Sequence, residues 1–222
     1  MHGFSRRHTV DQALEWLDAH LRTLDAEDVP LRAAAGRVLS ATVVSNIDVP
    51  GFDRATMDGY AVVAESTEGA TPYNRISLNV VGDALPASPF SGRVTRGEAV
   101  RIMTGAPMPS GSDAVLPAES VETTGGIFAT SEVSPQKNVG HRGEDIVRGT
   151  TLLEGGRVLR PQDLGVMSSI GLATARVVRR PRVRLVITGN ELLPTGSTPH
   201  DYHITDANGP MLAALTERDG GV

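Results

Sequence analysis

Glycine and proline recur every few residues between positions 47 and 148, and this density limits what the chain can form there. The protein has 24 glycines and 14 prolines among 222 residues, and helix interiors tolerate neither residue well. Between the turns lie short runs in which apolar and polar residues alternate, as in ISLNV at 76–80, a period typical of half-buried strands. Gly125 and Gly126 separate two further runs, which is a hairpin signal. We therefore predict a compact β-rich domain over 47–148.

The segment before this domain has a helical pattern. Thr9 and Gln12 have the spacing of a capping box, and apolar residues then recur at helical intervals opposite an acidic face, which predicts a helix over 9–24. We expect its apolar stripe to pack on another part of the chain. A shorter helix is predicted over 31–39, followed by an extended segment at 42–45. The stripe consists of Val10, Ala13, Leu14, Leu17, Leu21 and Leu24.

After residue 150 the pattern changes again. Pro161 at a first-turn position and Gly171 just beyond the last turn bracket a predicted helix over 161–170. An extended segment follows at 174–178. These elements flank the β-rich domain on the other side in sequence, so we predict that an extended domain is built from residues before and after it.

The last part of the sequence predicts one apolar strand at 183–187 and one helix that begins near 208–210 and stops at Gly220 and Gly221. A single strand and helix make no stable α/β layer, because the strand would have open edges. We therefore expect this chain to be the N-terminal part of a longer protein. We expect the strand at 183–187 to provide the apolar surface on which the helix at 9–24 packs.

Together these patterns predict an α+β, multidomain chain with a β-rich inserted domain. Four parts are expected: an N-terminal helix in 1–24 that packs on the α/β part, an extended linker domain from 25–46 plus 149–178, the β-rich domain at 47–148, and the start of a truncated α/β domain at 179–222.

Composition excludes several kinds of chemistry. The chain has no cysteine and therefore no disulfide, thiolate metal site or cysteine nucleophile. Its only lysine, Lys137, lies in Gln-Lys-Asn, so there is no Walker-type phosphate loop. A net charge of −5 argues against a general nucleic-acid binder. No stretch has the length of a membrane span or of a signal peptide's apolar region, so we expect a cytoplasmic protein with no membrane partner. With only eight aromatic residues, the core must consist mainly of Val, Leu, Ile and Ala.

Three acids spaced by five residues lie in the loop segment from 48 to 58. Asp48, Asp53 and Asp58 occur among turn-forming residues, so one interpretation is two turns leading into a strand. The other is a cluster of oxygen ligands for a hard cation.

Two short apolar runs end in Thr-Gly, at Thr104-Gly105 and at Thr188-Gly189. A hydroxyl followed by successive backbone N–H groups can bind an oxyanion. The alternative is a proline-stiffened strand connection. The repetition of this element favours an oxyanionic ligand.

Other charged groups have plainer interpretations. Glu144 and Asp145 follow Gly143, and Glu144 has Arg142 and Arg148 nearby as surface ion-pair partners. His200 and His203 next to Pro199 are typical of a solvated loop rather than a zinc site. The five arginines between 176 and 184 have no interleaved aromatic residues for base stacking, which favours a solvated edge with salt bridges.

Six segments in order resemble the MoeA-type molybdopterin molybdenumtransferases, the family that includes the gephyrin E-domain. They extend from about residue 8 to 222. The segments are VPGFDRATMDGYA at 49–61, RIMTGAP at 101–107 with SDAV at 112–115, RGED at 142–145, the stretch 159–171 around Pro161, VITGNEL at 186–192 and ITDAN at 204–208.

The resemblance implies a cytoplasmic transferase that inserts molybdate into adenylylated molybdopterin with release of AMP, the final step of molybdenum cofactor biosynthesis, aided by Mg²⁺. It also implies an elongated homodimer whose cleft lies between the β domain of one subunit and the α/β pterin-binding domain of the other. Because the later segments of the pterin site are missing, we expect this chain to be inactive by itself.

Carried over by position, the resemblance implies roles for eight residues. The catalytic residues are Asp58, Thr104, Asp145 and Glu191, of which Asp58, Asp145 and Glu191 are also metal ligands. The residues that bind the cofactor precursor are Thr104, Gly105, Thr188, Gly189 and Asp206.

One position departs from the family pattern, because Asn190 stands where Thr-Gly-Asp-Glu-Leu is usual. Because asparagine has no negative charge, we do not expect a metal ligand at this position. Two other classes of function stay open: a non-catalytic dimerisation or scaffold module of the same fold, and a nucleic-acid binder that uses the arginines at 176–184. A salt-dependent affinity for DNA or RNA would favour the latter.

Overall fold

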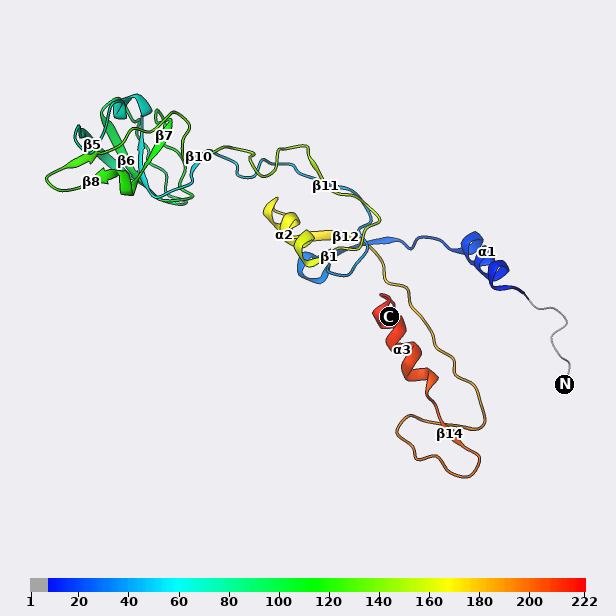
Figure 1. Ribbon diagram of the computed structural model, residues 1–222. Helices are drawn as coiled ribbons and strands as arrows, with labels where there is room; N and C mark the ends of the chain where they lie inside the picture. The colour runs from blue at the N-terminus through cyan, green and yellow to red at the C-terminus, as the bar shows by residue number, and fades with distance from the viewer. Residues whose placement is uncertain (1–7) are drawn as a thin grey trace. The chain divides into compact units, whose positions relative to one another are not determined.

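The computed structural model describes residues 8–222, a chain that is mostly β with few helices (Figure 1). It divides into two compact units. Val44–Thr151 forms one unit, and Leu152–Val222 with the N-terminal residues up to Val43 forms the other. The predicted division into four parts stays a prediction. None of the helices among the described residues is both long and apolar enough to cross a membrane.

The Val44–Thr151 unit contains a six-stranded, nearly closed barrel-like sheet. Its strand order is β7-β4-β6-β5-β9-β8, with β5 and β6 parallel and the other neighbours antiparallel. The strands are β4 (Gly59–Val62), β5 (Ile76–Ala84), β6 (Glu98–Ile102), β7 (Ala114–Pro117), β8 (Val121–Glu122) and β9 (Ile127–Ala129).

Two of the sequence predictions in this sheet are confirmed. The alternating run at 76–80 is the first part of β5, and the two runs around Gly125 and Gly126 pair as β8 and β9. The hairpin loop has four residues rather than two, because β8 ends at Glu122 and β9 begins at Ile127. Both glycines in that loop have positive φ, as a tight connection requires.

The core of this sheet lies on both of its faces. Successive residues of a strand point to opposite sides, so Ala61 and Val62 in β4 belong to two different clusters of buried side chains. Ile102 and Leu116 are the largest fully buried members. The fully buried side chains of both clusters are Val, Leu, Ile and Ala, as the composition predicted.

Two further strand pairs are short. β3 (Arg54–Ala55) pairs with β10 (Val139–Gly140), and β2 (Val43–Val44) pairs with β11 (Thr151–Leu153), which confirms the extended segment expected at 42–45. Two 3₁₀ turns, Ala64–Thr67 and Ala118–Ser120, join strands of the sheet.

In the other unit, β1 (Ala26–Pro30) pairs antiparallel with β12 (Thr174–Val178). The helix α2 (Pro161–Ser169) directly precedes β12 in the chain. Both the helix at 161–170 and the extended segment at 174–178 are confirmed. Gly171 follows the helix with φ of +85°, the left-handed conformation that ends helices.

The predicted helix at 31–39 is wrong. Only a 3₁₀ turn forms, at Leu31–Ala33. Gly36 adopts φ of +76°, which interrupts a helix, and Val38 and Leu39 then form β-bridges to Val158 and Val177. These partners are more than a hundred residues away in sequence, so a local pattern contains no signal for them.

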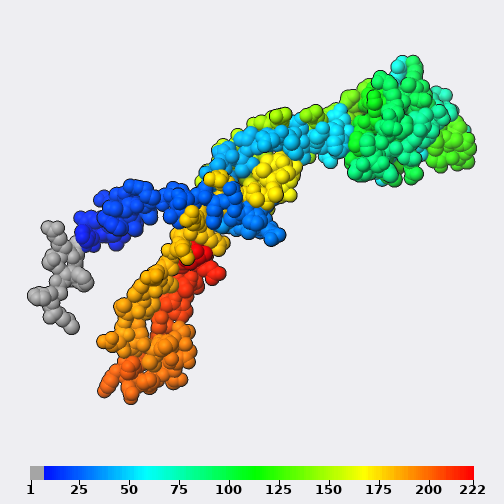
Figure 2. Space-filling model, turned by 180° about the vertical axis from the view of Figure 1, so that it is seen from behind, coloured from blue at the N-terminus to red at the C-terminus, as the bar shows by residue number. Residues whose placement is uncertain are grey.

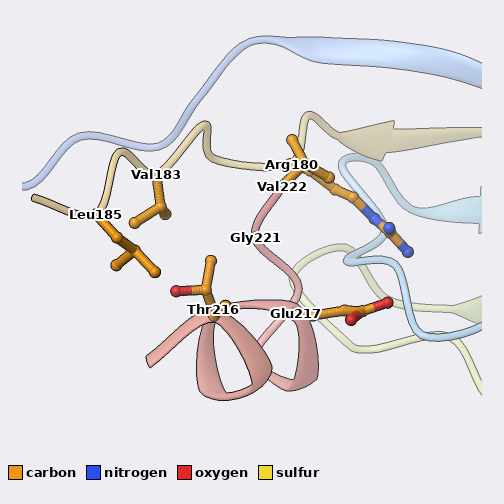
Figure 3. A pocket seen from close by; sticks show the side chains of 8 residues that line it. Arg180, Val183, Leu185, Thr216, Glu217, Gly221 and Val222 are labelled. Carbon is orange, nitrogen blue, oxygen red and sulfur yellow. The ribbon is translucent and has the colours of Figure 1, made fainter. Parts of the chain in front are cut away.

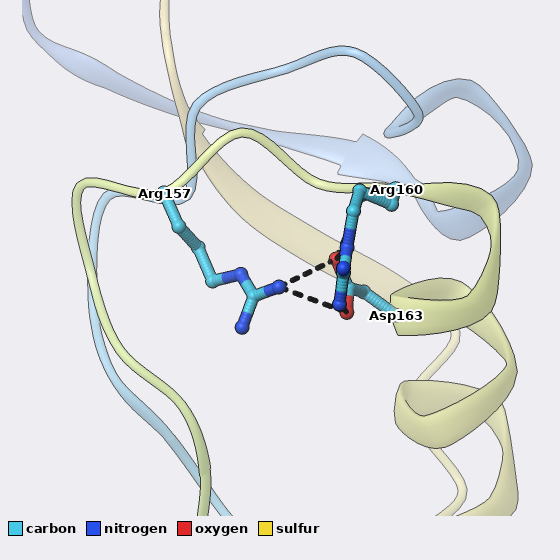
Figure 4. Close-up of polar contacts among 3 residues, drawn as sticks. All are labelled: Arg157, Arg160 and Asp163. Carbon is cyan, nitrogen blue, oxygen red and sulfur yellow. Dashed lines mark hydrogen bonds and ion pairs between the residues drawn. The ribbon is translucent and has the colours of Figure 1, made fainter.

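The most enclosed charged side chain described in this unit is Asp163 at the start of α2 (Figure 4). Its carboxylate accepts hydrogen bonds from the side chain and backbone N–H of Arg160 and from Arg157, at 2.8–3.2 Å. Hydrogen bonds from the Arg160 side chain, then from its backbone, lower the pKa of Asp163 to about 2. The carboxylate therefore joins the loop before α2 to the first turn of the helix.

Replacing Asp163 by asparagine is expected to destabilise the chain at pH 7 and to have a smaller effect in acid. A carboxyl group whose pKa is lowered from 3.8 to about 2 contributes stability above pH 3.8, and this contribution is lost as the pH falls toward 2. Thermal unfolding of Asp163→Asn and wild type at pH 7, 4 and 2.5 measures the difference. Asp28→Asn, which removes one partner of an exposed pair with Arg176, is the control. A difference in unfolding temperature between Asp163→Asn and wild type that stays constant with pH would contradict this account.

The N-terminal helix α1 (Val10–His20) begins where predicted, with the capping box of Thr9 and Gln12 formed. It ends earlier than residue 24, because Leu21 is extended with ψ of 140°. Every residue of α1 is exposed, including the leucines of its apolar stripe. The packing of this stripe on the α/β part stays a prediction.

The predicted strand at 183–187 does not form. A strand requires a neighbour along its length, and the backbone bonds near its start join only Val183 N–H to Val222 O at 2.8 Å and Val222 N–H to Pro181 O at 2.9 Å within the described residues. The pairing that does occur in this part of the chain is parallel, between β13 (Leu192–Leu193) and β14 (Ile204–Thr205).

The final helix, α3 (Asn208–Arg218), is confirmed, as is its stop at Gly220 and Gly221. Between this helix and the extended 180–185 segment lies a pocket of about 300 Å³ (Figure 3). Val183 and Leu185 point toward the helix across it. Both side chains belong to the run that was expected to form a strand.

Candidate functional site

Asp58 and Thr104, which the sequence placed in separate motifs, are in direct contact. The backbone N–H and the hydroxyl of Thr104 both donate to Asp58 Oδ1, each at 2.7 Å. These bonds, the backbone one first, lower the pKa of Asp58 below its ordinary value. The contact follows from the pairing of β4 with β6, because Asp58 directly precedes β4 and Thr104 lies two residues beyond the end of β6.

The turn that carries Asp58 is held tightly against β7 and the residues after it. Asp58 O accepts a hydrogen bond from Ala118 N–H at 3.1 Å. The neighbouring Gly59 has no room for a side chain, because a β-carbon there would overlap the carbonyl oxygen of Leu116. Only glycine therefore allows this backbone approach.

Asp58 lines a groove of about 450 Å³ on the β-rich unit. Side chains of both polar and apolar character meet there, which suits a ligand with a charged group and a less polar body. Besides Asp58, the groove is lined by Gly59, Tyr60, Arg101, Ile102, Met103, Ala118 and Thr123.

The other two acids of the 48–58 segment bind nitrogen donors. Asp48 accepts from Arg142 Nε at 2.6 Å and from Arg148 N–H at 2.8 Å, and Asp53 accepts from Arg142 N–H at 2.8 Å. Hydrogen bonds from the Arg148 backbone and then the Arg142 side chain lower the pKa of Asp48. Within residues 8–222, no group of three or more histidine, aspartate or glutamate side chains is placed to hold a metal ion. The turn interpretation of this loop is therefore favoured over the cation cluster.

The RGED segment forms a loop beside residues 48–53. Asp145 is 60 % exposed, and its carboxylate lies 3.9 Å from Arg54 Nη2. Of the two partners expected for Glu144, Arg142 pairs with Asp48 instead, and neither Arg142 nor Arg148 forms an ion pair with Glu144 in the described part of the chain. Figure 2 shows the two chain passages, residues 44–50 and 145–151, side by side, as their backbone bonds require.

The candidate residues of the C-terminal segment lie outside regular strands. Thr188 and Gly189 belong to no helix or strand, and Glu191 is exposed beside Gly189. Asp206 has a structural role, because its Oδ1 accepts the N–H groups of Asn208 and Gly209, each at 2.9 Å, where α3 begins. An aspartate in this position stabilises a helix start.

Two of the five arginines between 176 and 184 have carboxylate partners. Arg176 pairs with Asp28 at 3.0 Å and Arg179 with Asp25 at 3.6 Å, and all four side chains are largely exposed. The rings of His200, which is exposed, and His203, which is half-buried, have centroids 5.1 Å apart.

Two features of the structure were missed from the sequence. Nothing in the sequence around Asp48 indicates that it accepts hydrogen bonds from two distant arginines. The role of Asp163 could have been predicted, because it follows Arg160 by three residues at a helix that begins with proline, and this is the spacing of a capping residue.

The site roles assigned by resemblance remain predictions, but the relationship itself is supported by comparison with known proteins. Residues 8–171 match the family described as MoeA N-terminal region, domains I and II. The chain is similar to molybdopterin molybdenumtransferase 2 of Mycobacterium tuberculosis, with 40 % identity over 196 residues, covering 87 % of this chain and 48 % of the relative. It is 32 % identical over 212 residues to molybdopterin molybdenumtransferase of Staphylococcus aureus, covering 95 % of this chain and 51 % of that protein.

Solved structures agree. Two crystal structures of molybdopterin biosynthesis MoeA protein from Pyrococcus horikoshii superpose with TM-scores of 0.84, at 34 % and 37 % identity. They match 97 % and 95 % of this chain and 56 % and 57 % of their own. The chain thus spans about half the length of the curated relatives it matches. With the sequence motifs, the family match and these superpositions in agreement, the chain belongs to the MoeA N-terminal region family.

Proposed function

We propose that this chain acts in molybdenum cofactor biosynthesis as part of a molybdopterin molybdenumtransferase. The reaction is insertion of molybdate into adenylylated molybdopterin with release of AMP. The relatives' names support this assignment, and the Asp58–Thr104 contact is the single observation in the chain that carries it.

The contact prepares Asp58 to act on a charged substrate. Two donors on Oδ1 keep the carboxylate ionised, because they favour its charged form. They also orient the carboxylate through Oδ1 at the groove that Asp58 lines. Gly105, with φ of +85°, lets the chain turn directly after Thr104.

Carboxylate oxygens are ligands that Mg²⁺ accepts while it keeps several waters. Asp58, Asp145 and Glu191 are each proposed as Mg²⁺ ligands in the assembled enzyme, although residues 8–222 contain no preformed group of three such side chains. When bound, the metal would neutralise charge on substrate phosphate oxygens. Thr188, Gly189 and Asp206 are proposed to contact the pterin substrate, with Asp206 also capping α3.

The proposal includes a homodimer in the cytoplasm, in which two subunits complete each site. It also includes inactivity of the isolated chain, since ligand sites in α/β sheets are built from loops of several neighbouring strands and the 183–187 strand has not formed here.

A hybrid enzyme tests the function. Residues 8–171 of this chain would replace the matching region of the Staphylococcus aureus relative, and molybdate-dependent AMP release would be measured. We expect an active hybrid, and we expect Asp58→Asn to lower its rate by about 100-fold or more, the usual effect of removing a group that stabilises developing charge. Thr104→Ser, which keeps both donors, should retain most activity.

The control is Asp28→Asn, an exposed pair partner outside the groove, which should leave AMP release unchanged. The isolated 222-residue chain should release no AMP. An Asp58→Asn hybrid with wild-type turnover would refute the catalytic role of Asp58, and an inactive but folded wild-type hybrid would refute the proposed function of the region.

A further inference from the structure

We propose that Arg101 binds an oxyanion, a phosphate or molybdate group of the ligand, in the groove that Asp58 lines. The link between this oxyanion and the substrate rests on the proposed function. Neither the motifs nor the resemblance gave Arg101 a role, so it is a further binding residue of the same site.

Arg101 is the one exposed residue of β6. This strand lies inside the sheet, between β4 and β5, and its other residues are buried or half-buried. Ala99 precedes Arg101 by two residues and therefore lies on the same face, where it is fully buried in the cluster that contains Val62 and Leu78. The side chains that cover this face thus end between Ala99 and Arg101, and beyond them Arg101 lines the groove.

The strand register determines the neighbours of Arg101. Tyr60 in β4 and Asp83 in β5 are its direct partners, and partners across a ladder lie on the same face of a sheet. Tyr60 packs against the buried cluster and also lines the groove. Two residues of extended chain, about 7 Å, separate Tyr60 from Asp58. The cation and the carboxylate therefore occupy different positions along the groove.

The guanidinium of Arg101 is not used within the protein. Among the ion pairs of residues 8–222, none includes Arg101. Other arginines of the β-rich unit do have carboxylate partners: Arg54 with Asp145, Arg75 with Glu122, Arg96 with Glu65 and Arg142 with Asp48. Asp58 is satisfied without Arg101, because Thr104 supplies both donors to its Oδ1. Arg101 therefore keeps its charge and its donors for a ligand.

A guanidinium has the right chemistry for an oxyanion. It stays protonated in proteins, and its planar fork donates two parallel hydrogen bonds to phosphate-like oxygens. The exposed Thr123 adds a hydroxyl to the groove, and Tyr60 and Met103 add less polar surface for the body of the ligand. The carboxylate of Asp58 repels an anion, so the two charged residues of the groove should have opposite effects on anion binding.

Amide NMR titrations of the full chain with inorganic phosphate, AMP and molybdate test this assignment. In the wild type we expect saturable shifts at residues 58–60 and 101–103, and the anion with the lowest midpoint identifies the group that the site takes. Arg101→Gln should raise that midpoint about tenfold or more, the effect of losing a charge-assisted hydrogen bond. Arg101→Lys, which keeps the charge without the fork, should recover part of the loss.

Two variants serve as controls. Arg96→Gln removes the same charge from an exposed pair with Glu65 outside the groove and should not move the midpoint. Asp58→Asn removes the carboxylate from the groove and should leave the midpoint unchanged or lower it, whereas damage to the groove would raise it. Amide exchange in β4 and β6 checks that each variant is folded.

Two results would overturn the role of Arg101: no saturable shift at residues 101–103 in the wild type, or equal midpoints in the wild type and Arg101→Gln. Failure of the proposed function gives a different result. A folded but inactive hybrid enzyme, together with anion binding that requires Arg101, would refute the function and leave the oxyanion site standing. In an active hybrid, Arg101→Gln should raise KM for the anionic substrate.

Discussion

Replacing Gly59 by alanine is expected to destabilise the β-rich unit strongly. A β-carbon at this position would overlap the carbonyl oxygen of Leu116 and lie 3.0 Å from the backbone nitrogen of Ala118. Both are backbone atoms, and Gly59 is paired with Ile102 on one side and Pro117 on the other. Neither neighbouring strand is able to move away without breaking its ladder, so we expect a loss of about 3 kcal/mol or more in unfolding free energy.

Amide hydrogen exchange of β4 and β6 in the full chain measures this loss. Gly51→Ala is the matched control in the same unit, because a β-carbon there would be 3.8 Å from the Asp48 carbonyl oxygen, an ordinary contact. The control should change the free energy by less than about 0.5 kcal/mol, as is usual for surface substitutions. Equal protection in Gly59→Ala and Gly51→Ala would show that the β4–β7 approach is looser than described.

Replacing Ile102 by alanine is the second change with a large expected effect. Ile102 is 0 % exposed at the end of β6 and belongs to the core cluster that also contains Val100 and Val115. The truncated side chain leaves a cavity that strands paired on both sides of β6 have little freedom to fill. We expect a loss of about 2–5 kcal/mol.

A graded series tests this prediction. Ile102→Val removes a single methylene and should cost about 0.5–1.5 kcal/mol, as measured by urea unfolding followed through amide signals of the β-rich unit. Val80→Ala is the control. Val80 lies in β5 and is 38 % exposed, so its replacement should lower the free energy of unfolding less than Ile102→Ala does. If Ile102→Ala cost no more than Ile102→Val, the core around β6 would have to be adaptable rather than tightly packed.

Local chemistry in the sequence was enough to predict most of the regular elements. Alternation predicted β5, and the paired glycines predicted the β8–β9 hairpin. Capping residues predicted the start of α1, and a first-turn proline predicted the start of α2. In each case the signal and the structure lie within a few residues of each other, so the backbone conformation follows from propensities and hydrogen bonds that neighbouring residues supply.

Two elements were predicted wrongly because distant partners decide their structure. The apolar run at 183–187 has the composition of a strand, but a strand forms only when another pairs with it, and here Val183 bonds to Val222 at the start of the run. Residues 31–39 have helical spacing, but Val38 and Leu39 are bound by Val158 and Val177. Apolar periodicity reports which residues become buried and contains no information about which partner buries them.

The candidate site divides in the same way. The sequence by itself determined which side chains have the right chemistry, including Asp58, Thr104 and Asp145, because carboxylates, hydroxyls and Thr-Gly turns are recognisable residue by residue. Only the tertiary structure decided their contacts: Asp58 meets Thr104 across 46 residues, and Asp48 meets Arg142 and Arg148 across 94 and 100. The physical reason is that strand register, set by the pairing of β4 with β6 and of β3 with β10, brings these loops together, and register depends on burial summed over the whole sheet rather than on any one segment.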